Sequence, residues 1–251
     1  MFSDIAVGIK TFLRDDKLYK AIDGIRRNLP EAQMIIADDG YIHTKKQKLY
    51  YELADEGHTI LECAFDSGFG HKSNRIADHL TRPYLLIGSD DFDFTPQACT
   101  GVYRLQEVLE VTDIDNTSGR VRSRPYEFNL EINDEVVTEH PVNPTRPITV
   151  VDLTVNYSMI KRHVFDKVRW DDDVKIGGGE HGAFFYDVKL AGYKVAYIDG
   201  VNIDEQNHQD THLYRSYRSR SISKARPCFV KRGIKKYILG TGEVDYDSKL
   251  S

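Results

Sequence analysis

Apolar stretches of strand length alternate with amphipathic stretches over the first hundred residues. The apolar stretches end in polar residues and predict strands over 5–12, 33–37, 59–64 and 84–88. Between them, apolar residues recur every three or four positions and predict helices over 17–28, 45–56 and 72–80. This alternation predicts an α/β fold, with a mostly parallel sheet and helices on both faces.

The middle of the chain has a different pattern. A helix is predicted over 99–110, and 111–155 then alternates like short strands, with turn signals such as Asn133-Asp134. We interpret this stretch as a small antiparallel insert. Beyond it the pattern predicts a strand-to-helix step over 156–167, a helix over 183–191, a strand over 194–198 and a charged tail.

Composition limits the kinds of ligand. The 251 residues include 34 Lys and Arg and 39 Asp and Glu, for a net charge of −5, so an anionic ligand needs a local basic patch or a metal. The unpaired cysteines Cys63, Cys99 and Cys228 favour a reducing compartment. Because we find no secretory signal and no apolar run of about 20 residues, we expect a cytoplasmic protein.

The most informative segment is Tyr84–Phe94, where an apolar strand ends in Asp90, Asp91 and Asp93. Clustered carboxylates repel one another unless a cation or several donors offset them. At the carboxyl end of a strand they lie where open α/β sheets bind ligands, and their oxygens suit Mg²⁺ or Mn²⁺. The alternative is an acidic turn that caps the next helix.

Other strand exits also carry polar groups. Lys10, Thr11 and Arg14 follow the first strand. The loop Gly68–Arg75 places two glycines before a helix start, where the backbone can approach an anion. Its spacing is not that of a P-loop.

Six segments occur in the order found in glycosyltransferases of the A-type fold, and they resemble most closely the ganglioside-type β-1,4-N-acetylgalactosaminyltransferases. These segments span about four fifths of the chain: 7–14, 35–40, 85–94, 151–160, 170–186 and 192–197. The resemblance implies a metal-dependent, inverting transfer of a sugar from a nucleotide diphosphate donor, with UDP expected, to a hydroxyl of a glycan. It also implies one integrated domain. Its parts are a nucleotide-sugar-binding half over 1–98, an acceptor-side half with the insert over 99–212 and a basic tail over 213–251.

The resemblance also implies donor-binding residues. A carboxylate after the second strand, Asp38 or Asp39, would accept the N–H of a uracil-type base. The other candidates are polar or basic residues near the ribose and phosphates: Thr11, Arg14, Asn74, Arg75, Asp90, Arg215 and Arg218, with Arg220 beside them.

The metal motif of this family is usually Asp-x-Asp. Here Ser89 stands where the first Asp is expected, which leaves Asp90 and Asp91, and a second frame uses Asp91 and Asp93. We expect Asp91, common to both frames, to be a ligand. A late histidine would complete the site: His208, or else His212. An imidazole ligand would favour Mn²⁺ over Mg²⁺.

The acceptor side is expected in segment 170–182. Gly178 and Gly179 allow a tight turn, and Trp170 could stack on an acceptor sugar or pack in the core. The family often has Glu-Asp where this chain has Glu180 and His181. Either Glu180 accepts the acceptor proton, or His181 does so while Glu180 orients it. Alternatively, Glu180 only caps its helix.

Between Arg215 and Lys236 lie nine basic residues and no acidic ones. Such a run can be a solvated face, a patch that contacts nucleic acid or a membrane surface, or a lid on the diphosphate. Two alternatives stay open: the same fold and carboxylates could serve a sugar nucleotidyltransferase, and the basic run could belong to a protein that binds or glycosylates nucleic acid. The absence of an anchor leads us to expect a bacterial or viral protein rather than a Golgi enzyme.

Overall fold

This computed structural model describes residues 2–155, 157–175, 179–206, 210–218 and 226–249. The candidate residues Gly178, His208 and Arg220 lie outside this described part. Within it, no helix is both long enough and apolar enough to cross a membrane.

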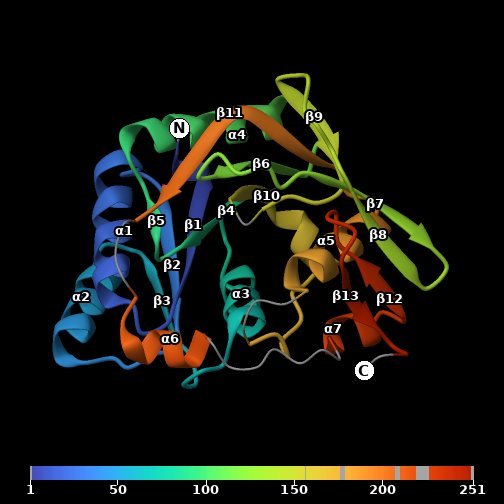
Figure 1. The fold of residues 1–251 in the computed structure, drawn as a ribbon. Coiled ribbons are helices and arrows are strands. Elements are labelled where there is room, and N and C mark those ends of the chain that lie inside the picture. The colour runs from blue at the N-terminus through green and yellow to red at the C-terminus, as the bar shows by residue number, and fades with distance from the viewer. Residues whose placement is uncertain (1, 156, 176–178, 207–209, 219–225, 250–251) are drawn as a thin grey trace.

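The first half forms the predicted alternation of strands and helices (Figure 1). After a short 3₁₀ turn over Phe2–Asp4, the elements are β1 (Ile5–Thr11), α1 (Asp15–Asn28), β2 (Gln33–Asp38), α2 (Thr44–Asp55), β3 (Thr59–Glu62), α3 (Phe69–Asp78) and β4 (Tyr84–Ser89). Strands β3, β2, β1 and β4 pair in parallel. The parallel half of the predicted sheet is thus confirmed.

The second half extends this sheet. It contains β5 (Phe92–Asp93), α4 (Pro96–Val111), β6 (Asn116–Val121), β7 (Phe128–Asn133), β8 (Val136–Pro141), β9 (Ile148–Val151), β10 (Ser158–Lys161), a 3₁₀ turn (Arg162–Asp166), α5 (Glu180–Leu190) and β11 (Val195–Glu205). The large sheet has the order β3-β2-β1-β4-β10-β6-β11-β5, with β9 on β11. Strand β10 is antiparallel to both of its neighbours, whereas β6 is parallel to β11.

The predicted insert is smaller than expected. Of the strands in the predicted insert, β7 and β8 form an antiparallel hairpin outside the large sheet, whereas β6 is a central strand of that sheet. After α6 (His212–Arg218) and α7 (Pro227–Val230), strands β12 (Lys236–Ile238) and β13 (Val244–Asp247) join β8 and β7 in a second sheet. Much of the segment predicted as a charged tail is therefore folded.

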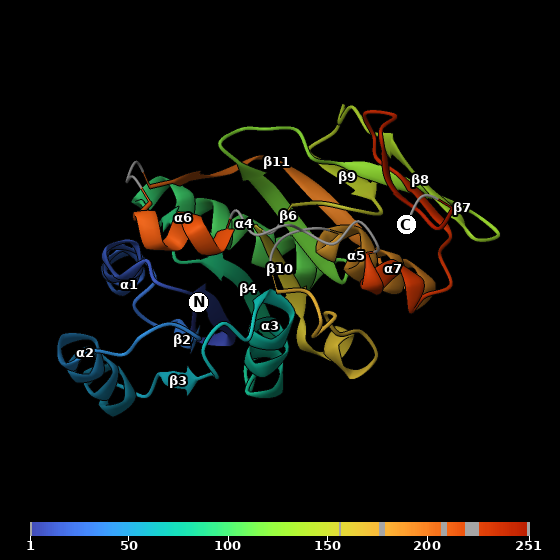
Figure 2. The ribbon, with the colours of Figure 1, turned by 60° about the horizontal axis from the view of Figure 1, so that its bottom comes forward.

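The large sheet separates two apolar cores. Helices α1, α2 and α4 cover one face, and α3, α5 and the second sheet cover the other (Figure 2). Successive residues of β1 alternate between them: Val7 and Ile9 face the first core and Ala6 the second. Since β1, β2, β4, β6 and β11 all point the same way, their carboxyl ends meet at one edge, where the predicted site residues gather.

Candidate functional site

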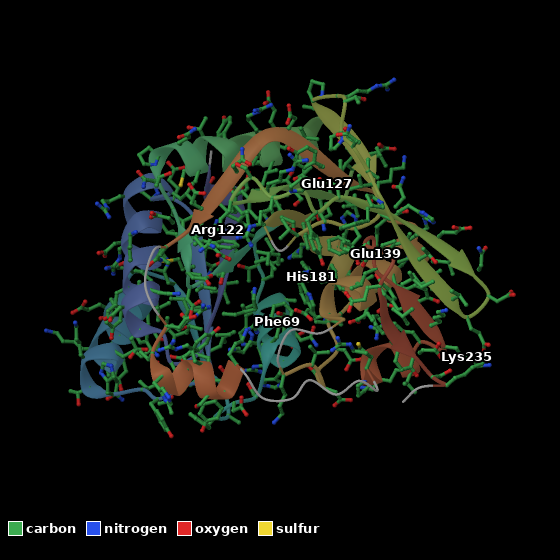
Figure 3. All side chains as sticks on the ribbon, in the orientation of Figure 1. Phe69, Arg122, Glu127, Glu139, His181 and Lys235 are labelled. Carbon is green, nitrogen blue, oxygen red and sulfur yellow. The ribbon has the colours of Figure 1, made fainter. Side chains whose placement is uncertain are left out.

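A cavity of about 430 Å³ opens at this edge. It is lined by the ends of β1, β4 and β6, the loop before α3, the start of α5, the end of β11 and α6. Figure 3 shows three of its residues: Phe69 of α3, His181 of α5 and Arg122, which follows β6. Seven of the predicted residues line it: Thr11, Arg14, Asp39, Asp91, Glu180, His181 and Arg218.

Asp90 anchors one side of the cavity but does not line it. Its buried carboxylate accepts hydrogen bonds from the Thr11 hydroxyl, at 2.9 Å, and from the Arg14 guanidinium, whose Nε lies 3.2 Å away. Burial raises the pKa of Asp90, and the positive charge of Arg14 opposes that rise. Asp90 therefore holds Arg14 in place, with no oxygen directed into the cavity.

Asp91 is the carboxylate of the motif that reaches the cavity. Its Oδ2 accepts from Arg14 Nη1 at 2.8 Å and its Oδ1 from the Ser89 hydroxyl. Burial alone would raise the pKa of Asp91, but Arg14 and Ser89 outweigh it and hold the pKa below its usual value. Asp93 lies elsewhere, on β5, where it pairs with Lys20 at 3.1 Å. The geometry thus favours the frame of Asp90 and Asp91.

The two carboxylates after β2 have different surroundings. Asp38 is buried away from the cavity, between Lys46 Nζ at 2.6 Å and the Tyr50 hydroxyl at 2.7 Å. Asp39 lines the cavity, where it accepts from Lys72 Nζ at 2.5 Å and from the backbone N–H of Gly68 at 2.8 Å. Of the two, Asp39 is placed to meet a ligand.

Glu180 and His181 begin α5 at the opposite wall. Gly179 precedes them with φ of +84°, a left-handed conformation that suits glycine, and an added Cβ would meet Phe229 at 3.0 Å. The His181 Nε2 lies 3.9 Å from Glu180 Oε1, and the Tyr126 ring packs edge-on to the imidazole at 5.9 Å. Burial lowers the pKa of His181, Glu180 opposes this, and Lys10 adds to it. The imidazole is therefore neutral and able to accept a proton at pH 7.

Trp170 does not line the cavity. Its ring is 7% exposed and stacks on Phe184, with centroids 4.3 Å apart and planes within 8°, while Phe165 packs nearby at 5.6 Å. Of the two interpretations of Trp170, the structure supports core packing. An aromatic residue that does line the cavity is Tyr126, which was not predicted because it lies in a loop without a motif.

Asn74 and Arg75 are not among the lining residues. The Asn74 amide instead binds the loop after Trp170: its Nδ2 donates to the Trp170 carbonyl and to Asp172 Oδ1, both at 2.8 Å, and its Oδ1 accepts from Trp170 N–H at 2.9 Å. Asn74 thus ties α3 to the loop that leads toward α5.

This contact yields a prediction for Asn74→Ala. We expect the variant to lose about 1–3 kcal/mol of unfolding free energy, because three loop groups lose their partner, while its affinity for UDP stays within twofold of the parent. Urea unfolding and calorimetric titration would measure these quantities. A large loss of UDP affinity at unchanged stability would instead make Asn74 a nucleotide ligand.

Helix α6 covers the cavity near Arg14. The Tyr214 ring stacks on the Arg14 guanidinium at 4.6 Å, and Tyr217 packs edge-on to Phe12 at 5.3 Å. Arg218 reaches the cavity, whereas Arg215 and His212 of the same helix are not among the lining residues. Helix α6 therefore lines the cavity with two aromatic side chains, Tyr214 and Tyr217, as well as with the cation Arg218.

The groups of this cavity that could bind a divalent ion are carboxylate oxygens. Asp91, between β4 and β5, and Glu205, at the end of β11, both line the cavity, and the two segments are joined where Gln206 N–H donates to the Asp91 carbonyl at 2.7 Å. Among the described residues, no group of three His, Cys, Asp or Glu side chains is arranged to hold a metal. The carboxylates Asp91 and Glu205 fit Mg²⁺ or Mn²⁺ chemically, as a partial donor set.

Comparisons with known proteins place this geometry in context. No family model matches the chain. It is 32% identical over 126 residues to mouse β-1,4 N-acetylgalactosaminyltransferase 2 and 36% identical over 118 residues to human β-1,4 N-acetylgalactosaminyltransferase 1. These matches cover 50% and 47% of this chain but only 23% and 20% of the relatives. The chain thus spans about a fifth of their length, and the resemblance found in the sequence is confirmed.

Solved structures of similar fold are also glycosyltransferases. GalNAc-T7 with UDP, GalNAc and Mn²⁺ matches with a TM-score of 0.62 at 13% identity, over 82% of this chain and 46% of that one. A Pyrobaculum calidifontis mannosyltransferase in complex with GDP-mannose and Mn²⁺ matches with a TM-score of 0.59 at 12% identity, over 92% and 69%. The chain has the glycosyltransferase A-type fold.

Proposed function

We propose that this protein is an inverting glycosyltransferase that transfers a sugar from a UDP-sugar to a hydroxyl of a glycan. The observation that carries the proposal is that Asp91 with Arg14, on one wall, faces the same cavity as Glu180 with His181 on the other. The names of the curated relatives suggest N-acetylgalactosamine as the sugar.

On the donor side, Asp39 accepts the imide N–H of the uracil. Asp90, which accepts from the Thr11 hydroxyl, holds Arg14 toward the phosphates. Asp91 and Glu205 would hold Mn²⁺ or Mg²⁺, with His208, a predicted ligand outside the described residues, as a further candidate. When bound, such an ion offsets the negative charge of the diphosphate. Arg218 of α6 adds a cation at the rim of the same cavity.

On the acceptor side, His181 accepts the proton of the attacking hydroxyl, and Glu180 orients the imidazole and stabilises its charged form. The acceptor oxygen then forms a bond to the anomeric carbon, while the bond from that carbon to the diphosphate oxygen breaks. Because attack comes from the wall opposite the diphosphate, the anomeric configuration inverts.

The proposal is tested by incubating the protein with UDP-N-acetylgalactosamine and Mn²⁺ and following release of UDP, with and without sialylated and neutral oligosaccharides. We expect Mn²⁺-dependent release that a suitable acceptor accelerates, with an inverted linkage seen by NMR. If the protein does not bind UDP in the presence of Mn²⁺, the proposal is wrong.

The pH profile yields a second prediction. Since the pKa of His181 is below its ordinary value of 6.5, the imidazole is unprotonated at pH 7 and gains a proton only at lower pH. We expect kcat/KM for the acceptor to change little between pH 7.5 and 7 and to fall tenfold per pH unit once the pH is below the lowered pKa. A stopped assay between pH 4.5 and 7.5 measures this. A profile that already falls between pH 7.5 and 7 would exclude a base of lowered pKa.

A further inference from the structure

The cavity contains an ammonium group, that of Lys10, for which the described part of the chain supplies no ion-pair partner. Lys10 lies at the carboxyl end of β1, where its Nζ donates to the Gly88 carbonyl at 2.9 Å and lies 5.2 Å from the centre of the Phe69 ring. Among the described residues, no carboxylate oxygen lies within 4 Å of this Nζ. Burial, with the help of Lys72, lowers the pKa of Lys10 to about 8, although Asp90 and Asp91 partly offset the effect.

The other cations of the cavity differ from Lys10. Arg14 is bound by Asp90 and Asp91, Lys72 by Asp39, and Arg122 by Glu205 at 2.7 Å. A second group lies exposed at the rim, in water: Arg124, Lys175 and Arg218. Lys10 is thus half-buried and, among the described residues, without an ion-pair partner, a costly combination unless a ligand supplies the negative charge.

The position of Lys10 indicates which anionic group of a ligand would contact it. In the sheet it is paired with Ser89, two residues before Asp91, so it belongs to the donor wall. Its charge also acts on His181 across the cavity. A group that contacts Lys10 therefore lies between the acidic motif and the proposed base, where the bond between sugar and phosphate would break.

We propose that Lys10 is a further catalytic residue, whose ammonium binds the phosphate oxygen nearest the transferred sugar and stabilises the charge that the diphosphate gains as it leaves. One Lys10 hydrogen is used by Gly88, and two remain for the ligand. This inference rests on the proposed glycosyl transfer. The electron pair of the broken bond goes to the phosphate oxygen, and the proton of the acceptor hydroxyl goes to His181.

Binding of UDP and UMP to Lys10→Met tests the position of the ammonium. A charge-assisted hydrogen bond that is lost costs about tenfold to a hundredfold in affinity, so UDP should bind that much more weakly, whereas UMP, which lacks the outer phosphate, should stay within twofold. Lys10→Arg should retain most of the UDP affinity. Equal affinities of the parent and Lys10→Met for UDP, or equal losses for UDP and UMP, would overturn the proposal.

Kinetics of the same variants test the catalytic role. Because charge on the diphosphate increases in the transition state, kcat should fall further than UDP affinity does in Lys10→Met and recover partly in Lys10→Arg. Lys194→Met is the matched control, since Lys194 pairs with Asp113 at the surface, and it should equal the parent. Thermal unfolding checks that Lys10→Met remains folded.

The outcomes separate the two proposals. If the parent transfers sugar and Lys10→Met does so at the same rate, the role of Lys10 is wrong and the transferase proposal stands. If the parent binds UDP but transfers to no acceptor and does not hydrolyse the donor, the transferase proposal is wrong, and the UDP and UMP affinities still decide what Lys10 binds.

Discussion

His181→Ala should lower kcat for transfer by about 10²–10⁴-fold, the usual contribution of a positioned general base. The affinity for UDP should remain within twofold, because the imidazole lies on the wall opposite Asp91 and Asp39. Initial rates at saturating donor, together with calorimetric titration of UDP, measure both effects.

Two variants control this experiment. His181→Asp introduces the residue that the resembling family often has at this position, and we expect it to recover more activity than His181→Asn, which cannot accept a proton. Glu180→Gln should lower kcat less than His181→Ala if Glu180 only orients the imidazole. If Glu180→Gln removes activity and His181→Ala retains it, then Glu180 is the base.

Asp91→Asn should lower kcat/KM for the donor by about 100-fold or more. Even mutating a residue that only hydrogen-bonds to a metal ligand typically costs about 10–100-fold in metal affinity or activity. The change keeps the size of the side chain and a hydrogen-bonding oxygen but removes the charge that attracts a divalent cation. Its effect should appear as a weaker dependence of UDP binding on Mn²⁺, measured by titrating the metal at fixed nucleotide.

Asp93→Asn is the matched comparison for the second frame of the motif. Asp93 pairs with Lys20 outside the cavity, so this variant should retain Mn²⁺-dependent binding within a few fold. Loss of metal dependence in Asp93→Asn, with none in Asp91→Asn, would reverse our assignment of the frame.

The parallel half of the fold was predictable because apolar periodicity and strand exits are local properties. Strand β6 was not, because its residues Asn116, Thr117 and Ser118 are polar yet fully buried. The Thr117 hydroxyl donates to the Leu105 carbonyl at 3.0 Å and that of Ser118 to the Tyr157 carbonyl at 2.9 Å. Buried hydroxyls that find backbone acceptors do not incur the usual cost of burial, so a central strand can have the sequence of a loop.

The residues of the candidate site were likewise predictable only in part. Residues directly after strands, such as Asp39 and Asp91, were found because the sheet brings strand ends together. Tyr126 and Tyr214 were not, since they reach the cavity from a loop and a helix whose positions depend on tertiary packing. The side chains of Asp38 and Asn74 have polar atoms of the kind that bind a ligand, yet these atoms are hydrogen-bonded to other residues of the protein.

The packing around Gly182 has a consequence for the order in which the protein assembles during synthesis. Gly182 of α5 has no side chain, and the phenol of Tyr237 from β12 fills that space while its hydroxyl donates to Glu139 of β8 at 2.9 Å. On the ribosome, Tyr237 emerges 55 residues after Gly182. The helix that carries Glu180 and His181 acquires its final support only once residue 237 has emerged.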